Sequence, residues 1–272
     1  MMRRLAPIVL LMLALGAQKA AAQACTLTVT TLNFGTYTGA VLDGTAAGKI
    51  TCAGAWNIPM YTGTGAGATE TIRYMTGPNG VELSYKLFTD AARTNNWSDT
   101  TGNEDTGTGN TTVTVYGQIT ANQIVPPGTY TDTMSTATTT FPVTVVITGS
   151  CTISATNLAF GTYTGAVINA TSAVTTNCTD LMPFNIGLSV GNGSGATVTT
   201  RKMTGPGAAT LRYSMFRDSG RTLNWGNTVG TDTLAATGTG SAVQYTVYGQ
   251  LPAAQVTTQG AYTDTIIATV TY

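Results

Sequence analysis

The sequence predicts an all-β protein built from two tandem immunoglobulin-like sandwiches. Three observations support this prediction: strand- and turn-forming residues dominate the composition, apolar and polar residues alternate over short segments, and the chain repeats itself once. Of 272 residues, 58 are threonine and 32 are glycine, while only 9% are charged. Because threonine favours strands and glycine favours turns, this composition leaves little room for helices.

The charged residues exclude several classes of function. The chain has 12 basic and 12 acidic residues and no histidine. A nucleic-acid-binding surface needs clustered positive charge to neutralise phosphates, so we expect no nucleic-acid partner. Without histidine the chain lacks the usual general base and the commonest metal ligand. We therefore expect a protein that is not an enzyme and has no catalytic residue, cofactor or metal site.

The N-terminus predicts export. Two arginines precede an apolar run over residues 5–17, and a small-residue motif would be cleaved after Ala22 or Ala24. This pattern is typical of a secretory signal peptide, which we place at residues 1–24. The run is too short to cross a bilayer comfortably, and we expect no transmembrane segment after cleavage. The exported compartment permits disulfides.

Two copies of one module of about 115 residues make up the remainder of the chain. The distance between matching blocks grows from 126 to 132 residues, as small loop insertions in the second copy would produce. The matching pairs are Phe34–Val41 with Phe160–Val167, Met75–Pro78 with Met203–Pro206, Trp97 with Trp225, Thr114–Gln118 with Thr246–Gln250, and Tyr130–Thr133 with Tyr262–Thr265.

The four cysteines follow the same duplication. Cys25 and Cys52 are 27 residues apart, and so are Cys151 and Cys178. Four cysteines allow three pairings, but only one of them can be made separately by each copy. We therefore expect a Cys25–Cys52 and a Cys151–Cys178 disulfide, both structural.

Each copy contains short segments with period-two apolar spacing. Examples are Val113–Tyr116, Leu83–Leu87 and Leu211–Met215, and glycine-rich stretches such as Gly63–Gly67 and Gly191–Gly195 separate such segments. Alternation of this kind indicates strands with one buried face. Six or seven strands per copy favour a sandwich of immunoglobulin type.

Together these blocks resemble the spore coat protein U domain family. Each copy has an N-terminal Cys followed by an FGxYxG block, a second Cys 27 residues later, a DxxRxxxW stretch, a VYGQ block and a closing GxYTDT strand. The resemblance covers nearly the whole mature chain and implies the pilin-type module of archaic chaperone–usher pili. Tandem modules are similar in layout to the two-domain tip adhesin of such pili, in which each pilin lacks a strand that a neighbouring subunit donates.

The lengths of the two copies are consistent with this resemblance. We place the first domain at 25–140, a linker or complementing strand at 141–150 and the second domain at 151–272. The middle segment alternates as a donor strand should, and nothing comparable follows the second copy. Its inward-facing residues are expected to be Phe141, Val143, Val145 and Ile147.

We interpret this segment as completing the first domain from within the chain, which leaves the second domain without its last strand. In the alternative interpretation, 141–149 is the ordinary last strand of a complete domain, and the second copy is truncated. Both interpretations leave the second domain open. The resemblance then implies a periplasmic chaperone, an outer-membrane usher and a neighbouring pilin as partners, and a location at the cell surface or pilus tip after transit through the periplasm.

Surface-binding residues should lie where the first copy departs from the second. Two apolar segments differ in this way, and the resembled adhesins attach to abiotic surfaces through apolar loops. The candidate residues are Ile124, Val125, Pro126, Pro127, Ile58, Met60 and Tyr61.

The sequence is compatible with three functions. The first is a pilus tip adhesin that mediates attachment to an abiotic or host surface and biofilm formation. The second is a secreted structural spore-coat or matrix protein. The third is a carbohydrate-binding module that would stack sugars on Trp97 and Trp225. The recurring Asp90 and Arg93 indicate a structural turn or ion pair rather than catalysis.

Overall fold

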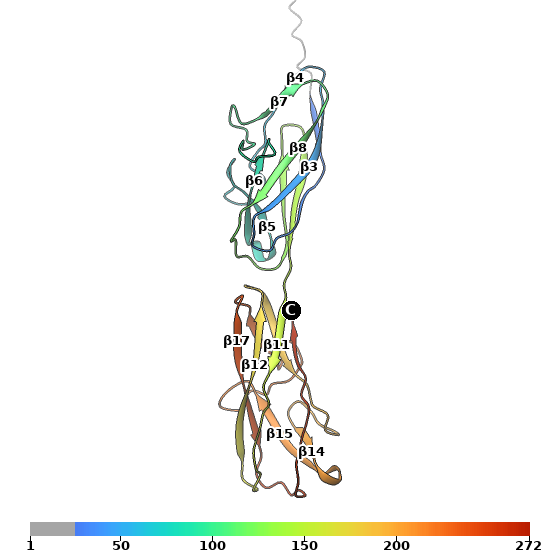
Figure 1. The fold of residues 1–272 in the computed structure, drawn as a ribbon, viewed down its shortest axis with the longest axis vertical. Coiled ribbons are helices and arrows are strands. Elements are labelled where there is room, and N and C mark those ends of the chain that lie inside the picture. The colour runs from blue at the N-terminus through green and yellow to red at the C-terminus, as the bar shows by residue number, and fades with distance from the viewer. Residues whose placement is uncertain (1–24) are drawn as a thin grey trace, which may run out of the picture.

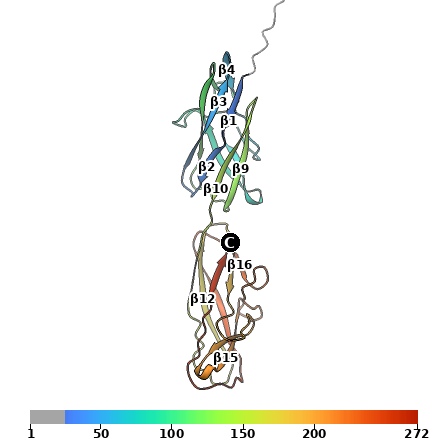
Figure 2. The same cartoon turned by 90° about the vertical axis from the view of Figure 1, so that its right-hand side faces the viewer.

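A computed structural model describes residues 25–272, so the predicted signal peptide lies outside the described residues. The chain forms two β-sandwiches that lie end to end, with the first domain above the second in Figure 1. Figure 2 shows the same arrangement from the side, and in both views the C-terminus lies close to the junction of the two domains. No helix within residues 25–272 is long and apolar enough to cross a membrane.

The first domain contains ten strands within the described residues. These are β1 (Thr26–Val29), β2 (Leu32–Thr36), β3 (Leu42–Thr51), β4 (Ala55–Ile58), β5 (Arg73–Thr76), β6 (Glu82–Phe88), β7 (Asp105–Thr108), β8 (Thr111–Ile119), β9 (Gly128–Ser135) and β10 (Thr140–Ile147).

The second domain contains eight strands in the same part of the chain. These are β11 (Cys151–Ala155), β12 (Ile168–Cys178), β13 (Pro183–Leu188), β14 (Arg201–Thr204), β15 (Thr210–Phe216), β16 (Leu234–Thr237), β17 (Ala242–Leu251) and β18 (Ala268–Thr271). One short 3-10 turn occurs in each domain, η1 (Pro78–Gly80) and η2 (Pro206–Ala208).

Buried and exposed side chains alternate along these strands, as the sequence predicts. Along β8, for example, Val115 and Ile119 are fully buried while Tyr116 and Gln118 are more exposed. Gly117 lies on the buried face, where a Cβ atom would come within 2.6 Å of the Phe34 ring. The repeated VYGQ block therefore carries its glycine to make room for the aromatic ring of the repeated FGxYxG block.

In the first domain, eight strands form one continuous hydrogen-bonded ladder in the order β1-β3-β8-β6-β5-β9-β10-β2. β1 and β2 are consecutive in the sequence yet lie at opposite ends of this ladder, so the N-terminal segment crosses from one side of the sandwich to the other. The pair β4–β7 forms a separate two-stranded sheet.

In the second domain the ladder is interrupted. Five strands pair in the order β11-β12-β17-β15-β14, and three more pair as β16-β13-β18. Among the described residues, no strand corresponds to β2 or β10 of the first domain. The second domain is therefore a sandwich with one side open.

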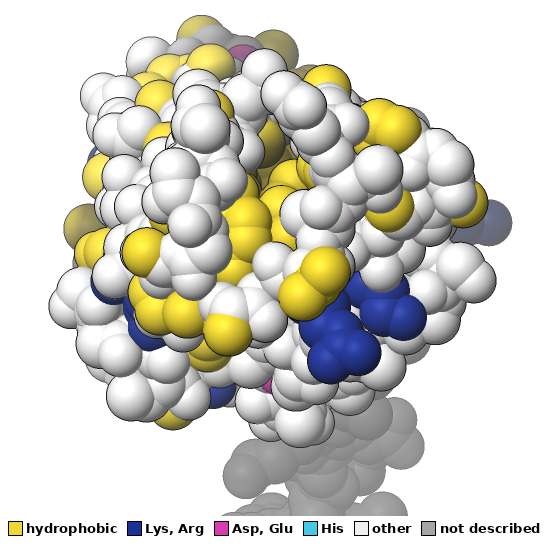
Figure 3. All heavy atoms as spheres, turned by 90° about the horizontal axis from the view of Figure 1, so that it is seen from below, with side chains coloured by type: hydrophobic (Ala, Val, Ile, Leu, Met, Phe, Trp, Pro, Cys, Tyr) yellow, Lys and Arg dark blue, Asp and Glu magenta, His cyan; other side chains and the backbone are white. Residues whose placement is uncertain are grey.

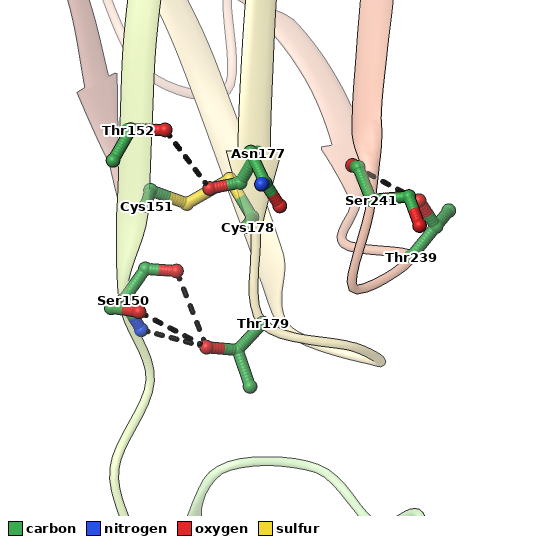
Figure 4. Close-up of a disulfide and its surroundings, with 8 residues drawn as sticks. All are labelled: Ser150, Cys151, Thr152, Asn177, Cys178, Thr179, Thr239 and Ser241. Carbon is green, nitrogen blue, oxygen red and sulfur yellow. Dashed lines mark hydrogen bonds between the residues drawn. A yellow bond between two sulfur atoms is a disulfide. The ribbon is translucent and has the colours of Figure 1, made fainter.

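In each domain a disulfide links the chain at the start of the first strand to the chain at the end of the strand that pairs with it. Cys25 is joined to Cys52 and Cys151 to Cys178. Cys151 and Cys178 are direct cross-strand partners in the β11–β12 pair, and Ser150 and Thr179 bond to each other next to them (Figure 4). The disulfide therefore fixes β11 at the point where the chain enters the second domain.

Removing the second disulfide should lower the stability of the second domain. We expect the double variant Cys151→Ser/Cys178→Ser to lose roughly 3–4 kcal/mol of unfolding free energy, because the cross-link closes a loop of 27 residues in the unfolded chain. Calorimetry of the mature chain would measure this loss. The first domain, which keeps its own disulfide, should unfold at an unchanged temperature, and an equal shift of both transitions would contradict the prediction.

Candidate functional site: the open groove of the second domain

Strand β10 occupies the middle of one side of the first domain. It pairs with β9 in antiparallel register, with Thr140 opposite Ser135. On its other side it runs parallel to β2, with Val143 opposite Leu32. A parallel pair requires a long connection between its strands, and the many residues between β2 and β10 provide one.

Every second side chain of β10 enters the core. Phe141, Val143, Val145 and Ile147 have exposed fractions of 1%, 0%, 0% and 9%. Val146, which points away from the core, is 40% exposed. This strand therefore seals the hydrophobic interior of the first domain.

The residues that β10 helps to cover are buried in the first domain and only half-buried in the second. Leu32, Phe34, Met75 and Tyr130 are between 0% and 5% exposed. Their counterparts in the second copy are only partly buried against its core, and these are Leu158, Phe160, Met203 and Tyr262. Side chains at equivalent positions thus belong to a closed core in the first domain and line an opening in the second domain.

Two adjoining cavities mark this opening. One has a volume of about 530 Å³ and extends along Ala155–Phe160 to Ile266 and Ala268. The other has a volume of about 660 Å³ and extends from Leu158 towards the loop 257–262. We call the two together the groove. Figure 3, which views the molecule from below, shows apolar side chains inside an opening between two largely polar edges.

Both edges of the groove have free hydrogen-bonding capacity. On one edge, residues 157–161 make no backbone–backbone hydrogen bond within the described part of the chain. On the other edge, the segment 260–267 makes backbone–backbone hydrogen bonds within the described residues only at Thr263, which pairs with Thr204, and at the Ile267 carbonyl, which accepts from Ser189 N–H. Backbone groups of this kind accept an added strand readily.

A polar anchor lies at the wall of the groove. The Tyr213 hydroxyl donates to Asp264 Oδ2 at 2.8 Å, and the Asn192 N–H donates to Asp264 Oδ1 at 2.7 Å. Burial and the bond to this carboxylate raise the pKa of Tyr213. Gly191 adopts a positive φ against Asp264, where a Cβ would lie 2.1 Å from Oδ2. Asp264 therefore fixes the segment 260–267 to the neighbouring loop and to β15.

A buried arginine supports each domain, and sequence analysis did not identify it. Arg201 is fully buried and donates to the carbonyls of Val198, Leu188, Ser189 and Trp225. Burial lowers its pKa. Arg73 has the same role in the first domain. The only sequence signal was that an arginine recurs two residues before each Met-Thr-Gly-Pro block.

Trp97 and Trp225 are fully buried, so neither can stack on a sugar. Their indole N–H groups donate to the carbonyls of Ile58 and Ile186 at 2.8 Å. The carbohydrate-binding interpretation, which relied on these two rings, is therefore wrong on this point.

The recurring Asp-Arg pair before each tryptophan shapes a turn. Asp90 accepts hydrogen bonds from the N–H groups of Thr94 and Asn95, and these bonds lower its pKa. Arg93 forms an ion pair with Asp43 at 3.2 Å.

The prediction that Ile58, Met60 and Tyr61 form a surface-binding segment is wrong for the first two. Ile58 and Met60 are 7% and 0% exposed and belong to the core of the first domain. The chain is held inward here because the carbonyls of Met60 and Tyr61 accept hydrogen bonds from Arg73 and Met60 N–H donates to Ser98. Tyr61 is 36% exposed.

The segment Ile124–Pro127 lies at the end of the first domain that faces the second domain. Ile124 is 67% exposed, and Val125 is partly buried against the core. Ile124 and Val125 line a cavity of about 350 Å³ together with Thr179 and Asp180 of the second domain. The predicted surface-binding residues of this segment therefore lie beside the second domain.

The family model for the spore coat protein U domain matches residues 11–136 and again residues 137–269. One similar curated protein is Protein U of Myxococcus xanthus, which is 36% identical over 128 residues, covering 42% of this chain and 71% of the relative.

Two solved structures of pilus adhesins are also similar in part. The chaperone–tip adhesion subunit pre-assembly complex CsuC–CsuE of Acinetobacter baumannii is 14% identical with a TM-score of 0.42, over 92% of this chain and all of that one. The CupB6 tip adhesin of Pseudomonas aeruginosa is 10% identical with a TM-score of 0.47, over 91% of this chain and 94% of that one. From the two family matches, the chain belongs to the spore coat protein U domain family and carries this domain twice in tandem.

Proposed function

We propose that this chain is a non-enzymatic subunit of a surface pilus, assembled by donor-strand complementation, and that it is the two-domain tip adhesin. One observation carries the proposal. The same strand position is filled by β10 in the first domain and is open in the second, with apolar walls and unpaired backbone on both edges.

The proposal assigns different roles to the two domains. Since β10 is paired on both sides within its own chain, it is not available to complete another subunit. The second domain receives a strand from a neighbouring pilin, and a periplasmic chaperone supplies a substitute strand before assembly. An outer-membrane usher then exports the subunit.

In this proposal the first domain contacts the target. The predicted signal peptide leads the chain to the periplasm, and the assembled protein resides at the tip of the pilus on the cell surface. There the first domain attaches to an abiotic or host surface and supports biofilm formation.

The groove can be tested with neighbouring isoleucines. Ile266 lines the groove, whereas Ile267 is 64% exposed. We expect Ile266→Asp to weaken binding of a labelled peptide with the sequence of residues 140–149 at least about tenfold, because a carboxylate would be buried against an apolar strand. Fluorescence anisotropy with the mature chain would measure this change. The matched control Ile267→Asp should bind the peptide as the unchanged chain does. Equal binding by all three proteins would refute the groove as the site that binds the strand.

The position at the tip has its own test. Gold-labelled antibody against the first domain should bind at fibre ends on producing cells, and deletion of the gene should reduce attachment and biofilm while fibres lacking the label persist. Labelling along the whole fibre would contradict a tip position and leave a shaft subunit.

A second candidate function is a secreted structural protein of a spore coat or matrix. The two matches to the spore coat protein U domain model favour it. In this case the protein would be recovered from the coat or matrix fraction rather than from sheared fibres.

A further inference from the structure

The junction between the two domains shows how a completed domain meets the body that follows its donor strand. β10 ends at Ile147, and β11 begins at Cys151. Such a short connection places the second domain directly at the lower end of the first, as both ribbon views show (Figures 1 and 2). A pilin that donates its N-terminal segment to the second domain would continue from the groove in the same way.

The first domain makes contacts at this junction beyond the strand itself. A Cβ atom at Gly149 would lie 2.2 Å from Met182 Sδ and 3.1 Å from Pro127 Cγ, so the connection lies tightly between the two domains. Ile124 and the turn at Thr179–Asp180 line one cavity. An apolar loop of the completed domain thus faces a turn with an acidic residue in the domain that follows.

The second domain has an equivalent loop at its own lower end, held by the same hydrogen bonds. The Tyr163 hydroxyl donates to the Pro252 carbonyl and accepts from Gln255 N–H, as Tyr37 does with the corresponding residues of the first domain. The next residue, Val256, corresponds to Ile124 and is completely exposed. The second domain therefore presents the same loop with no following domain against it in the described part of the chain.

The lower end of the second domain carries positive charge that the lower end of the first domain lacks. The Gln255 side chain bonds to the backbone N–H and carbonyl of Arg212, whose cross-strand partner is Lys202. In the first domain, Gln123 bonds to Ser84, whose cross-strand partner is Tyr74. Two uncharged residues are thus replaced by two positively charged ones beside the end of the groove, and Figure 3 shows Lys and Arg side chains next to the apolar opening.

Neither cation forms an ion pair with an acidic residue of the described part of the chain. Lys202 Nζ donates to the Ser194 carbonyl, and the ion pair found within residues 25–272 involves other residues. Like charges directly opposite each other on adjacent strands repel and reduce stability. The second domain is covalently linked to the first, so its docking does not depend on electrostatic attraction. A separate subunit, in contrast, associates faster with a surface of complementary charge.

We propose that Val256 and the Lys202–Arg212 pair form a second contact surface for the pilin whose strand enters the groove. This surface accepts an acidic turn of that pilin, in the position that Thr179–Asp180 occupies against the first domain. The inference rests on the proposed donor-strand function and adds the chemistry by which the neighbouring subunit is recognised outside the groove.

The second domain can itself serve as a model of the incoming subunit. All residues of its hydrophobic core lie from Cys151 onwards, so a fragment of residues 140–272 keeps every core residue that the second domain has in the full chain. With Ile266→Asp this fragment can donate its strand but cannot receive one. The acceptor is the mature chain 25–272, whose own β10 is already paired. Binding of the fragment and of the free peptide 140–149 would be measured by surface plasmon resonance at low and high salt.

The acceptor variant Lys202→Glu/Arg212→Glu should reduce the association rate of the fragment at least about tenfold at low salt, with a smaller reduction at high salt. Val256→Asp should increase the dissociation rate. Neither variant should change binding of the free peptide by more than about twofold, since the groove is intact. Asp180→Lys in the fragment should restore much of the association rate with the doubly substituted acceptor.

Two other binding results would separate failure of the second contact surface from failure of the donor-strand function. If the fragment binds the substituted acceptors as fast and as tightly as the unchanged chain, the second contact surface is refuted and the groove stands. If neither peptide nor fragment binds the unchanged chain, the donor-strand function itself is refuted, and the contact surface with it.

Discussion

The variant Val145→Asp should unfold the first domain while leaving the second intact. Val145 is fully buried in β10 and belongs to the hydrophobic core of the first domain. The substitution removes apolar burial and places an unpaired acid in the interior, which we expect to cost more than about 4 kcal/mol. A loss of this size is comparable to the whole stability of a small domain.

This outcome can be measured domain by domain. Trp56 and Trp97 lie in the first domain and Trp225 in the second, so fluorescence in a Trp225→Phe background follows the first domain alone. Val146→Asp is the matched control, because its side chain lies one residue away and is 40% exposed. It should change the unfolding free energy by less than about 1 kcal/mol. Similar melting curves for both variants would show that β10 does not seal the first domain.

Adding a strand to the second domain should produce a large stabilisation. We expect an extension after Tyr272, consisting of a flexible linker of about eight residues followed by the sequence of residues 140–149, to fold into the groove. The inserted side chains would bury apolar surface against Leu158, Phe160 and Tyr262, and the backbone would pair with both free edges. A gain of about 2–4 kcal/mol corresponds to a rise in melting temperature on the order of 10 °C.

Calorimetry and hydrogen exchange would test this extension. The amides of 157–161 and 260–267 should become protected when the strand is present. A control extension, in which the residues corresponding to Val143 and Val145 are aspartate, has the same length and should give no protection. If both extensions raise the melting temperature equally, the groove does not select an apolar strand.

The repeat determined what could be predicted from the sequence. Because both copies carry the same blocks, the two-domain sandwich could be predicted without coordinates. The alternation of β10 could be predicted from the segment 141–149, which only the first copy has. The apolar differences between the copies were misleading. Ile58 and Met60 looked like loop residues, yet the chain there is held inward by Arg73, whose contacts with distant carbonyls leave no pattern in the sequence.

Other features depend on contacts between distant segments. The location of Ile124 beside Asp180 follows from the packing of one domain on the next, which local periodicity does not encode. The Lys202–Arg212 pair becomes visible only when the register of β14 and β15 is known, since the two residues are ten positions apart. Burial of the tryptophans likewise follows from tertiary packing and not from their residue type.

The direction of β10 determines how the molecule would respond to mechanical load. The strand runs along the long axis of the molecule and continues directly into the second domain (Figure 2). A pull between the two domains would therefore act along β10 and load its hydrogen bonds with β9 and β2 together, in shear, instead of opening them one after another. Forced detachment is governed by an unfolding rate. We therefore expect the connection to withstand a higher tension in this geometry than it would if β10 were peeled away from one end, breaking its hydrogen bonds one at a time.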